Sequence, residues 1–281
     1  MQTKSNNEGF RALFTLPPIK DSASTAVAAP EMPQIVTVTG DREVDAVLWL
    51  QSIVGTGSQA LIDKAMEAVK LIKTPMKILE DRYAAHLRSS GAHPLQIVFG
   101  TVGFGDLEEQ AKRAIETSRN RHEALARFGN VESLAKDTPA EEACRKALRG
   151  LKRGVADFYD DEQARERFSR NHDLVPATID DCLYARVYWS KLYRLRNATA
   201  EFGDPLPQGY AHESYCLAML ARIMPRDFTE AESAFDHLYE SDSSGAKEGK
   251  SILRNLIASG WDAKREGVLR EKRETQSEVK A

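Results

Sequence analysis

The sequence predicts an all-α protein, a multi-helix bundle or an irregular helical array of about ten helices. Two observations predict this class. Apolar residues recur at three- and four-residue steps along most of the chain, which is the spacing of one face of a helix. Ser, Thr, Asp or Pro precedes many of these segments and Gly follows several, as helix starts and ends require.

Composition restricts the possible functions. A chain of 281 residues that is 42% hydrophobic can bury a sizeable core. A net charge of -3 provides no overall attraction to nucleic acid or to anionic lipid. The three cysteines are far apart and odd in number, which indicates reduced thiols and a cytoplasmic location. No apolar run approaches ~18 residues, so we expect no membrane-spanning helix and no membrane partner.

Residues 1–33 are expected to form a flexible arm, because residues 22–33 are mostly small residues and prolines and contain few large apolar groups. Within this arm, Phe10, Leu13 and Phe14 are spaced to form one apolar face of a helical turn. We predict that these three residues insert into a groove of a partner protein. The alternative is that the segment folds back onto its own domain. Residues 34–39 alternate like a strand, but no second convincing strand exists to pair with them.

A helical domain is predicted over residues 34–261, and its first helices are bounded by clear signals. One helix starts at Asp41 and ends at the glycines around residue 55, and Ser58 can cap the next. Pro75 suits the first turn of a third helix. The apolar, glycine-rich residues 95–105 form either a short buried helix or an irregular packed turn. A long helix over residues 106–128 is closed by Gly129.

The second half begins with a capping box, in which Thr138 and Glu141 flank Pro139 at the first helical position. This helix is expected to reach Gly150 or Gly154. Further helices are predicted at residues 162–170, 178–200, 210–224, 229–239 and 247–259, with a second capping box at Thr229 and Glu232. A subdivision of the domain is possible near residues 130–138 or 203–209, and residues 262–281 read as a charged tail.

The helix over residues 178–200 is expected to be surrounded by others, because its apolar residues occupy most of its circumference. A narrow polar stripe remains, made of Arg186, Ser190, Arg194 and Asn197. Arg186 and Arg194 are candidate contacts to a partner. The alternative, which we favour, is that they pair with carboxylates or carbonyl groups of a neighbouring helix.

Two basic segments are candidates for contact with nucleic-acid phosphates. Their members are Lys112, Arg113, Arg119 and Arg121 in the first and Arg149, Lys152 and Arg153 in the second. The alternative is a solvated helix face, because in both segments acids come first and bases last, as the helix dipole favours. The pairs Glu109–Arg113 and Glu123–Arg127 also fall at i,i+4 spacing and can partly neutralise each other.

No catalytic residue, metal site or cofactor is predicted. His212 and Cys216 are four residues apart, as two ligands on one helix face would be, but no CxxC or HExxH motif completes a site. The glycines at 100, 103 and 105 fit neither a GxGxxG nor a P-loop pattern, and no GxSxG motif is present. We therefore expect a non-catalytic cytoplasmic interaction or regulatory protein that binds another protein through helix faces. The alternative is a nucleic-acid-associated protein that uses the basic segments.

Overall fold

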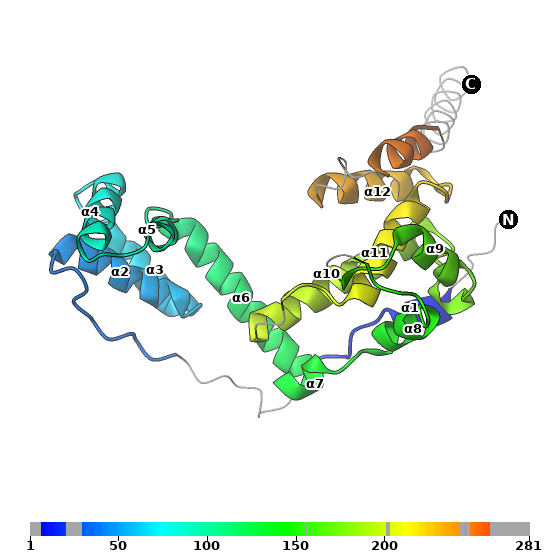
Figure 1. Cartoon of the computed structure of the whole chain (residues 1–281), viewed down its shortest axis with the longest axis horizontal. Coiled ribbons are helices and arrows are strands. Elements are labelled where there is room, and N and C mark those ends of the chain that lie inside the picture. The colour runs from blue at the N-terminus through cyan, green and yellow to red at the C-terminus, as the bar shows by residue number, and fades with distance from the viewer. Residues whose placement is uncertain are drawn as a thin grey trace, which may run out of the picture. The chain divides into compact units, whose positions relative to one another are not determined.

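The computed structural model describes residues 7–20, 30–154, 157–200, 203–241, 245 and 248–258. Every regular element in these ranges is helical, which confirms the predicted all-α class, and one isolated bridge pairs Arg153 with Tyr159. The charged tail at residues 262–281 lies outside the described residues, as do the parts of the arm at residues 1–6 and 21–29. Figure 1 labels the helices along the chain.

The chain contacts divide it into two compact units. Unit 1 comprises Met1–Pro18, Glu132–Asn197 and Phe202–Ala281, and unit 2 comprises Ile19–Val131 and Ala198–Glu201. The first boundary therefore falls at the start of the 130–138 segment. The first 18 residues of the chain belong to unit 1, although more than a hundred residues of unit 2 separate them from the rest of it.

The described residues of unit 2 form five helices: α2 (Arg42–Gly55), α3 (Gln59–Val69), α4 (Met76–Ser89), α5 (Pro94–Thr101) and α6 (Leu107–Phe128). Val47, Leu79 and Phe104 are buried in its core, which α2, α3, α4 and α6 enclose. The α2–α3 turn approaches α6 closely at Gly57, which has a φ of +66°. A Cβ there would lie 2.8 Å from the carbonyl oxygen of Ala114, so only glycine fits.

The helices of unit 1 are α1 (Glu8–Leu13), α8 (Pro139–Ala147), α9 (Asp161–Ser169), α10 (Ile179–Thr199), α11 (Pro207–Leu220) and α12 (Phe228–Glu240). A short helix, α7 (Val131–Ala135), begins at the unit boundary, and residues 249–258 are also helical. The core is aromatic and is centred on His212, which is fully buried. Its ring stacks on Phe14 at 4.6 Å and meets Phe168 edge-on at 5.1 Å.

Several predicted helix starts are confirmed. The capping box of α8 is present, since the Glu141 N–H donates to the Thr138 hydroxyl and the Glu141 carboxylate accepts from the Thr138 N–H. At α10 the Asp181 N–H donates to the Thr178 hydroxyl at 3.1 Å. Asp41, with its carboxylate accepting from two backbone N–H groups, caps α2.

Two boundary predictions were wrong. The cap of α12 is Asp227 rather than Thr229, because the Asp227 carboxylate accepts from the Glu230 N–H at 2.9 Å. Helix α8 ends at Ala147, short of both predicted ends, Gly150 and Gly154. Residues 34–39, for which no partner strand was expected, are not a strand in the structure, and the N–H groups of Val38 and Thr39 donate to the Asp45 carboxylate.

Candidate functional site

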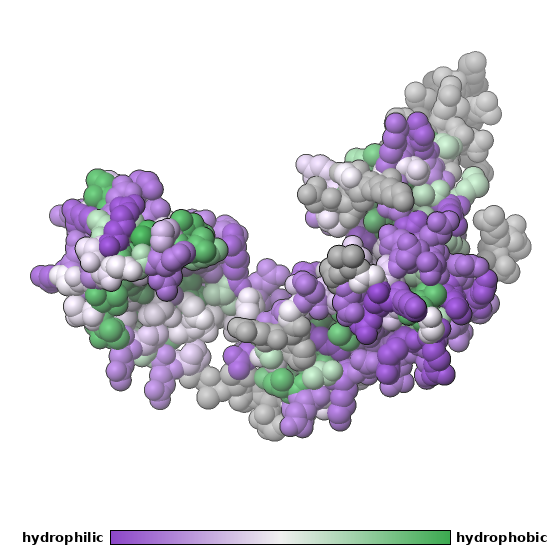
Figure 2. Space-filling model, in the orientation of Figure 1, coloured by the Kyte–Doolittle hydropathy of each residue, from purple (hydrophilic) through white to green (hydrophobic). Residues whose placement is uncertain are grey.

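The most exposed apolar helix face lies on α5. Three of its large side chains and that of Val102, the residue after its C-terminal end, remain in solvent: Leu95 at 58%, Val98 at 55%, Phe99 at 73% and Val102 at 69% exposed. They are spaced i, i+3, i+4 and i+7, and no residue of α5 is buried. We call this set the α5 face. Figure 2 shows green, hydrophobic surface where Figure 1 places α5.

The other side of α5 packs on its own unit. Along a helix that turns about 100° per residue, Ile97, Gly100 and Thr101 lie opposite the α5 face. Gly100 lies against Leu87 of α4, where an added Cβ would sit 3.2 Å from the leucine Cδ1. The position of α5 is therefore set by this inner side, and the α5 face is not needed for the core. Of the two alternatives weighed for residues 95–105, the structure has the helix, but exposed rather than buried.

The predicted partner-binding residues of the arm lie inside unit 1. Phe10 is 0% and Phe14 1% exposed, and Leu13 is half-buried. Phe14 packs against Tyr188 and Trp189 at ring distances of 5.7 Å. Burial in its own unit leaves these rings unavailable to a partner's groove, so the structure supports the alternative in which this segment folds back onto its own domain.

The two arginines of the predicted polar stripe have different surroundings. Arg186 is 6% exposed, and its Nε donates to His237 Nε2 at 2.8 Å while one Nη donates to the Glu213 carbonyl oxygen at 3.3 Å. These contacts support a structural role. Arg194 is exposed and donates to the Ser190 hydroxyl at 3.2 Å, so it remains at the surface of unit 1.

The basic residues of α6 do not form one face. Because the helix turns about 100° per residue, Arg121 lies on the side opposite Lys112 and Arg119. The predicted i,i+4 pairs are present, with Arg113 at 3.3 Å from Glu109 and Arg127 at 2.9 Å from Glu123. The cations of α6 are therefore spread around the helix and partly paired.

A cavity of about 600 Å³ in unit 2 brings Arg121 and His122 together with the α2–α3 turn. No carboxylate lines this cavity. Apart from the amide of Gln59, its remaining walls are hydroxyl-bearing or small: Pro30, Gly55, Thr56, Gly57, Ser58, Ala60, Ala114, Thr117, Ser118 and Ala198.

The second basic segment belongs to unit 1. Arg149 and Lys152 are exposed in the loop after α8, and Arg153 pairs with Asp157 at 2.6 Å. The basic residues of α6 belong to unit 2.

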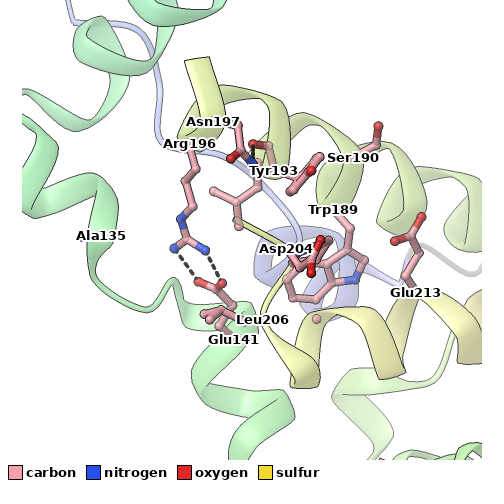
Figure 3. A pocket seen from close by; sticks show the side chains of 13 residues that line it. Ala135, Glu141, Trp189, Ser190, Tyr193, Arg196, Asn197, Asp204, Leu206 and Glu213 are labelled. Carbon is pink, nitrogen blue, oxygen red and sulfur yellow. Dashed lines mark hydrogen bonds and ion pairs between the residues drawn. The ribbon is translucent and has the colours of Figure 1, made fainter. Parts of the chain in front are cut away.

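A smaller cavity of about 240 Å³ lies in unit 1 beside α10 (Figure 3). One wall is a single face of α10, from Trp189 to Asn197, and the loop at residues 204–206 and the start of α11 form another. Gly209 allows the close approach of α11, because a Cβ there would lie 3.1 Å from the Trp189 ring. The lining residues are Ala135, Glu141, Trp189, Ser190, Leu192, Tyr193, Arg196, Asn197, Asp204, Pro205, Leu206, Gly209 and Glu213.

Two of the lining residues form a buried ion pair, which sequence reasoning missed. The Arg196 guanidinium donates to both oxygens of Glu141, at 2.5 and 2.9 Å, and to the carbonyl oxygens of Leu134 and Lys136 at 3.0 Å. Glu141 also accepts from the Thr138 hydroxyl, which in turn accepts from Tyr188. A capping box was the visible signal at Glu141, and nothing local in the sequence linked it to Arg196.

Burial favours the neutral forms of two titratable groups of unit 1, the His212 ring and the Cys216 thiol. Burial lowers the pKa of His212 to about 4, and its ring accepts from Trp189 Nε1 at Nδ1 and donates to the Leu174 carbonyl oxygen from Nε2. Burial also raises the pKa of the Cys216 thiol, which lies 3.6 Å from His212 Nδ1. Among the described residues no group of three or more His, Cys, Asp or Glu side chains could hold a metal ion.

Comparison with known proteins adds no family to this geometry. No protein-family model, curated protein or solved structure matches the chain. In the part of the chain that the structure describes, no helix has the length and apolarity needed to cross a membrane.

Proposed function

We propose that the protein is a non-catalytic interaction or regulatory protein that binds another protein through the α5 face. The observation that carries this proposal is the stripe of Leu95, Val98, Phe99 and Val102, which is more than half exposed at each position. Burying one large apolar side chain contributes about 1.5–3 kcal/mol. Burial of this stripe can therefore offset the cost of association and support binding.

The flanking sequence indicates the chemistry of the partner. Between Asp81 and Asp106 the chain contains no Asp or Glu, whereas it contains Arg82, Arg88 and two histidines. Arg82 pairs with Asp41 and Glu43, and Arg88 is exposed. An amphipathic segment with apolar anchors and carboxylates at its rim would bury the α5 face and meet no like charge there.

Defined probes test this proposal. The first is a synthetic helical peptide with Leu and Phe on one face and Glu on the other, and the second is the same peptide with Lys in place of Glu. We expect the acidic peptide to bind and the basic one to bind much more weakly. Phe99→Ser should weaken binding by roughly tenfold or more, as loss of a central aromatic anchor does. Leu71→Ser is the matched control, because Leu71 is 79% exposed elsewhere in unit 2.

Three results would contradict the proposal: equal binding of both peptides, equal loss in the two variants, or binding of anionic lipid vesicles through Phe99 with no binding of the acidic peptide. The last result would identify the α5 face as a membrane contact. A cytoplasmic location is part of the same proposal and is supported by three cysteines that are all free and buried.

The second candidate function is association with nucleic acid. It is favoured by the 600 Å³ cavity beside Arg121, whose lining contains no carboxylate and several hydroxyl groups. It predicts a mobility shift with single-stranded or double-stranded oligonucleotides that weakens steeply as salt is added. Arg121→Gln should reduce this affinity more than Lys112→Gln, and no shift at low salt would exclude it.

A further inference from the structure

We propose that the 240 Å³ cavity beside Trp189 binds a small organic cation, an amine or a guanidinium on a short apolar stem. A lysine or arginine side chain of another molecule carries such a group, as do free alkylamines and alkylguanidines. This inference concerns unit 1 and does not depend on the α5 face.

The charges that line the cavity favour a cation. Its walls carry three carboxylates, those of Glu141, Asp204 and Glu213, against one guanidinium, that of Arg196. Glu141 and Arg196 neutralise each other through their two-point ion pair. Of the charged groups that line the cavity, the carboxylates of Asp204 and Glu213 then remain to interact with a ligand.

The negative charge of the Glu213 carboxylate is only weakly balanced by a positive partner, although its access to solvent is limited. Its side chain is 28% exposed, and its described ion pair is a long one, 3.8 Å from Arg186 Nη2. Arg186 directs other donors to His237 and to the Glu213 backbone carbonyl. Burial raises the pKa of Glu213 even though the Arg186 charge lowers it. A ligand cation in the cavity could therefore pair with the Glu213 carboxylate, because Arg186 balances the charge of that carboxylate only in part.

The apolar walls suit the rest of such a ligand. Trp189 and Tyr193 contribute aromatic rings, and a cation over an aromatic ring gains about 0.5–2 kcal/mol. Figure 3 draws Asp204, Glu213 and Trp189 among the side chains that line the cavity. The Trp189 Nε1–H is already donated to His212, so the indole offers its ring rather than its N–H. Leu206, Pro205 and Leu192 complete an apolar lining for an aliphatic stem.

The volume limits the size of the ligand. A cavity of about 240 Å³ is smaller than the roughly 300–1,000 Å³ of sites for drug-sized ligands. It fits one side chain or a small amine. A ligand with so few atoms is expected to bind with a Kd on the order of 1 mM.

A matched set of small probes tests this inference. Butylguanidinium, butylamine, butanol and pentanoate share one butyl stem and differ in charge, and each is titrated into the full chain while Trp189 is followed by NMR. We expect the two cations to shift the Trp189 signals saturably and the alcohol and the acid to leave them unchanged. Glu213→Gln and Asp204→Asn should each weaken cation binding roughly tenfold, which corresponds to about 1.4 kcal/mol. Glu232→Gln, at an exposed acid on α12, should not change it.

The inference is overturned if butanol binds as well as the cations, if no probe binds, or if Glu213→Gln and Asp204→Asn both bind like the control. A thermal melt of each variant shows that it is folded. If a substituted protein unfolds, the comparison among the four probes on the unaltered chain still decides the matter.

Discussion

Glu141 and Arg196 face each other in a two-point ion pair with their side chains only 2% and 9% exposed. The pair joins the first turn of α8 to the last turns of α10. Its two charges are buried together, so each depends on the other.

Removing one partner should therefore be costly. We expect Glu141→Gln to destabilise unit 1 by about 3–5 kcal/mol, because it leaves the Arg196 guanidinium buried without a countercharge. Urea denaturation followed by circular dichroism measures the change. The neighbouring Glu142→Gln is the matched control, since Glu142 is 50% exposed and reaches Lys146 only at 3.8 Å. Equal stability of the two variants would contradict this role for the pair.

The packing of Phe14 makes a second prediction. Phe14→Ala removes a ring that stacks on His212 and contacts Tyr188 and Trp189, so we expect a loss of about 3–5 kcal/mol. Deletion of residues 1–33 removes the same ring and should destabilise unit 1 at least as much. If the arm were not packed on unit 1, its deletion would leave the stability unchanged. Ile19→Ala, at a side chain that is 56% exposed, should change stability little. An unaltered melting transition after the deletion would refute the burial of Phe10 and Phe14.

Stability should fall on mild acidification because of two histidines. Burial lowers the pKa of His212 to about 4, and burial together with the Arg186 charge lowers that of His237 to about 4. Their ordinary value is 6.5, so between pH 6.5 and pH 4 the unfolded chain binds protons that the folded protein does not. The contribution of these two groups to the free energy of unfolding is therefore constant above pH 6.5. It decreases as the pH falls from 6.5 to about 4, and it does not decrease further below pH 4.

Urea titrations at a series of pH values measure this loss. His212→Gln should show a shallower decline than the unaltered chain, since one titrating group is removed. A proton on Nδ1 would face the Trp189 Nε1–H, so protonation also breaks that hydrogen bond. An NMR-measured pKa of His212 near its ordinary value would contradict the prediction.

Cys144, Cys182 and Cys216 are all buried, and burial raises the pKa of each thiol. We expect all three to react slowly with iodoacetamide in the native protein and quickly in denaturant, because the thiolate is the reactive form. Mass spectrometry counts the modified residues. Rapid modification of Cys144, which is 0% exposed, would contradict its placement on the buried side of α8.

The sequence predicted those helices and caps that depend only on residues near one another in the chain. The cap at Thr138 and the helix over residues 178–200 needed only hydrogen bonding and spacing that the sequence displays. The capping-box spacing of Thr229 and Glu232 misplaced the start of α12, because the residue that caps it, Asp227, lies two residues earlier. The spacing of Phe10 and Phe14 predicted a helical turn. It did not predict where this turn packs, because the rings that surround it belong to residues beyond 160.

For the candidate sites, too, features that depend on residues far apart in the chain could not be predicted. Apolar composition placed residues 95–105 in the interior, but only Ile97, Gly100 and Thr101 lie on the inner side of α5, and the side chains of the α5 face stay outside. The link between Glu141 and Arg196 crosses 55 residues, and no local pattern marks it.

Replacing Phe99 with the photo-crosslinking residue benzoylphenylalanine in the native cell tests the central claim most directly. We expect a specific protein adduct at position 99 whose crosslinked peptide carries apolar residues and carboxylates, and no such adduct from the same probe at position 71. Equal labelling at both positions, or crosslinked peptides without acidic residues, would contradict the assignment of the α5 face as the partner-binding surface.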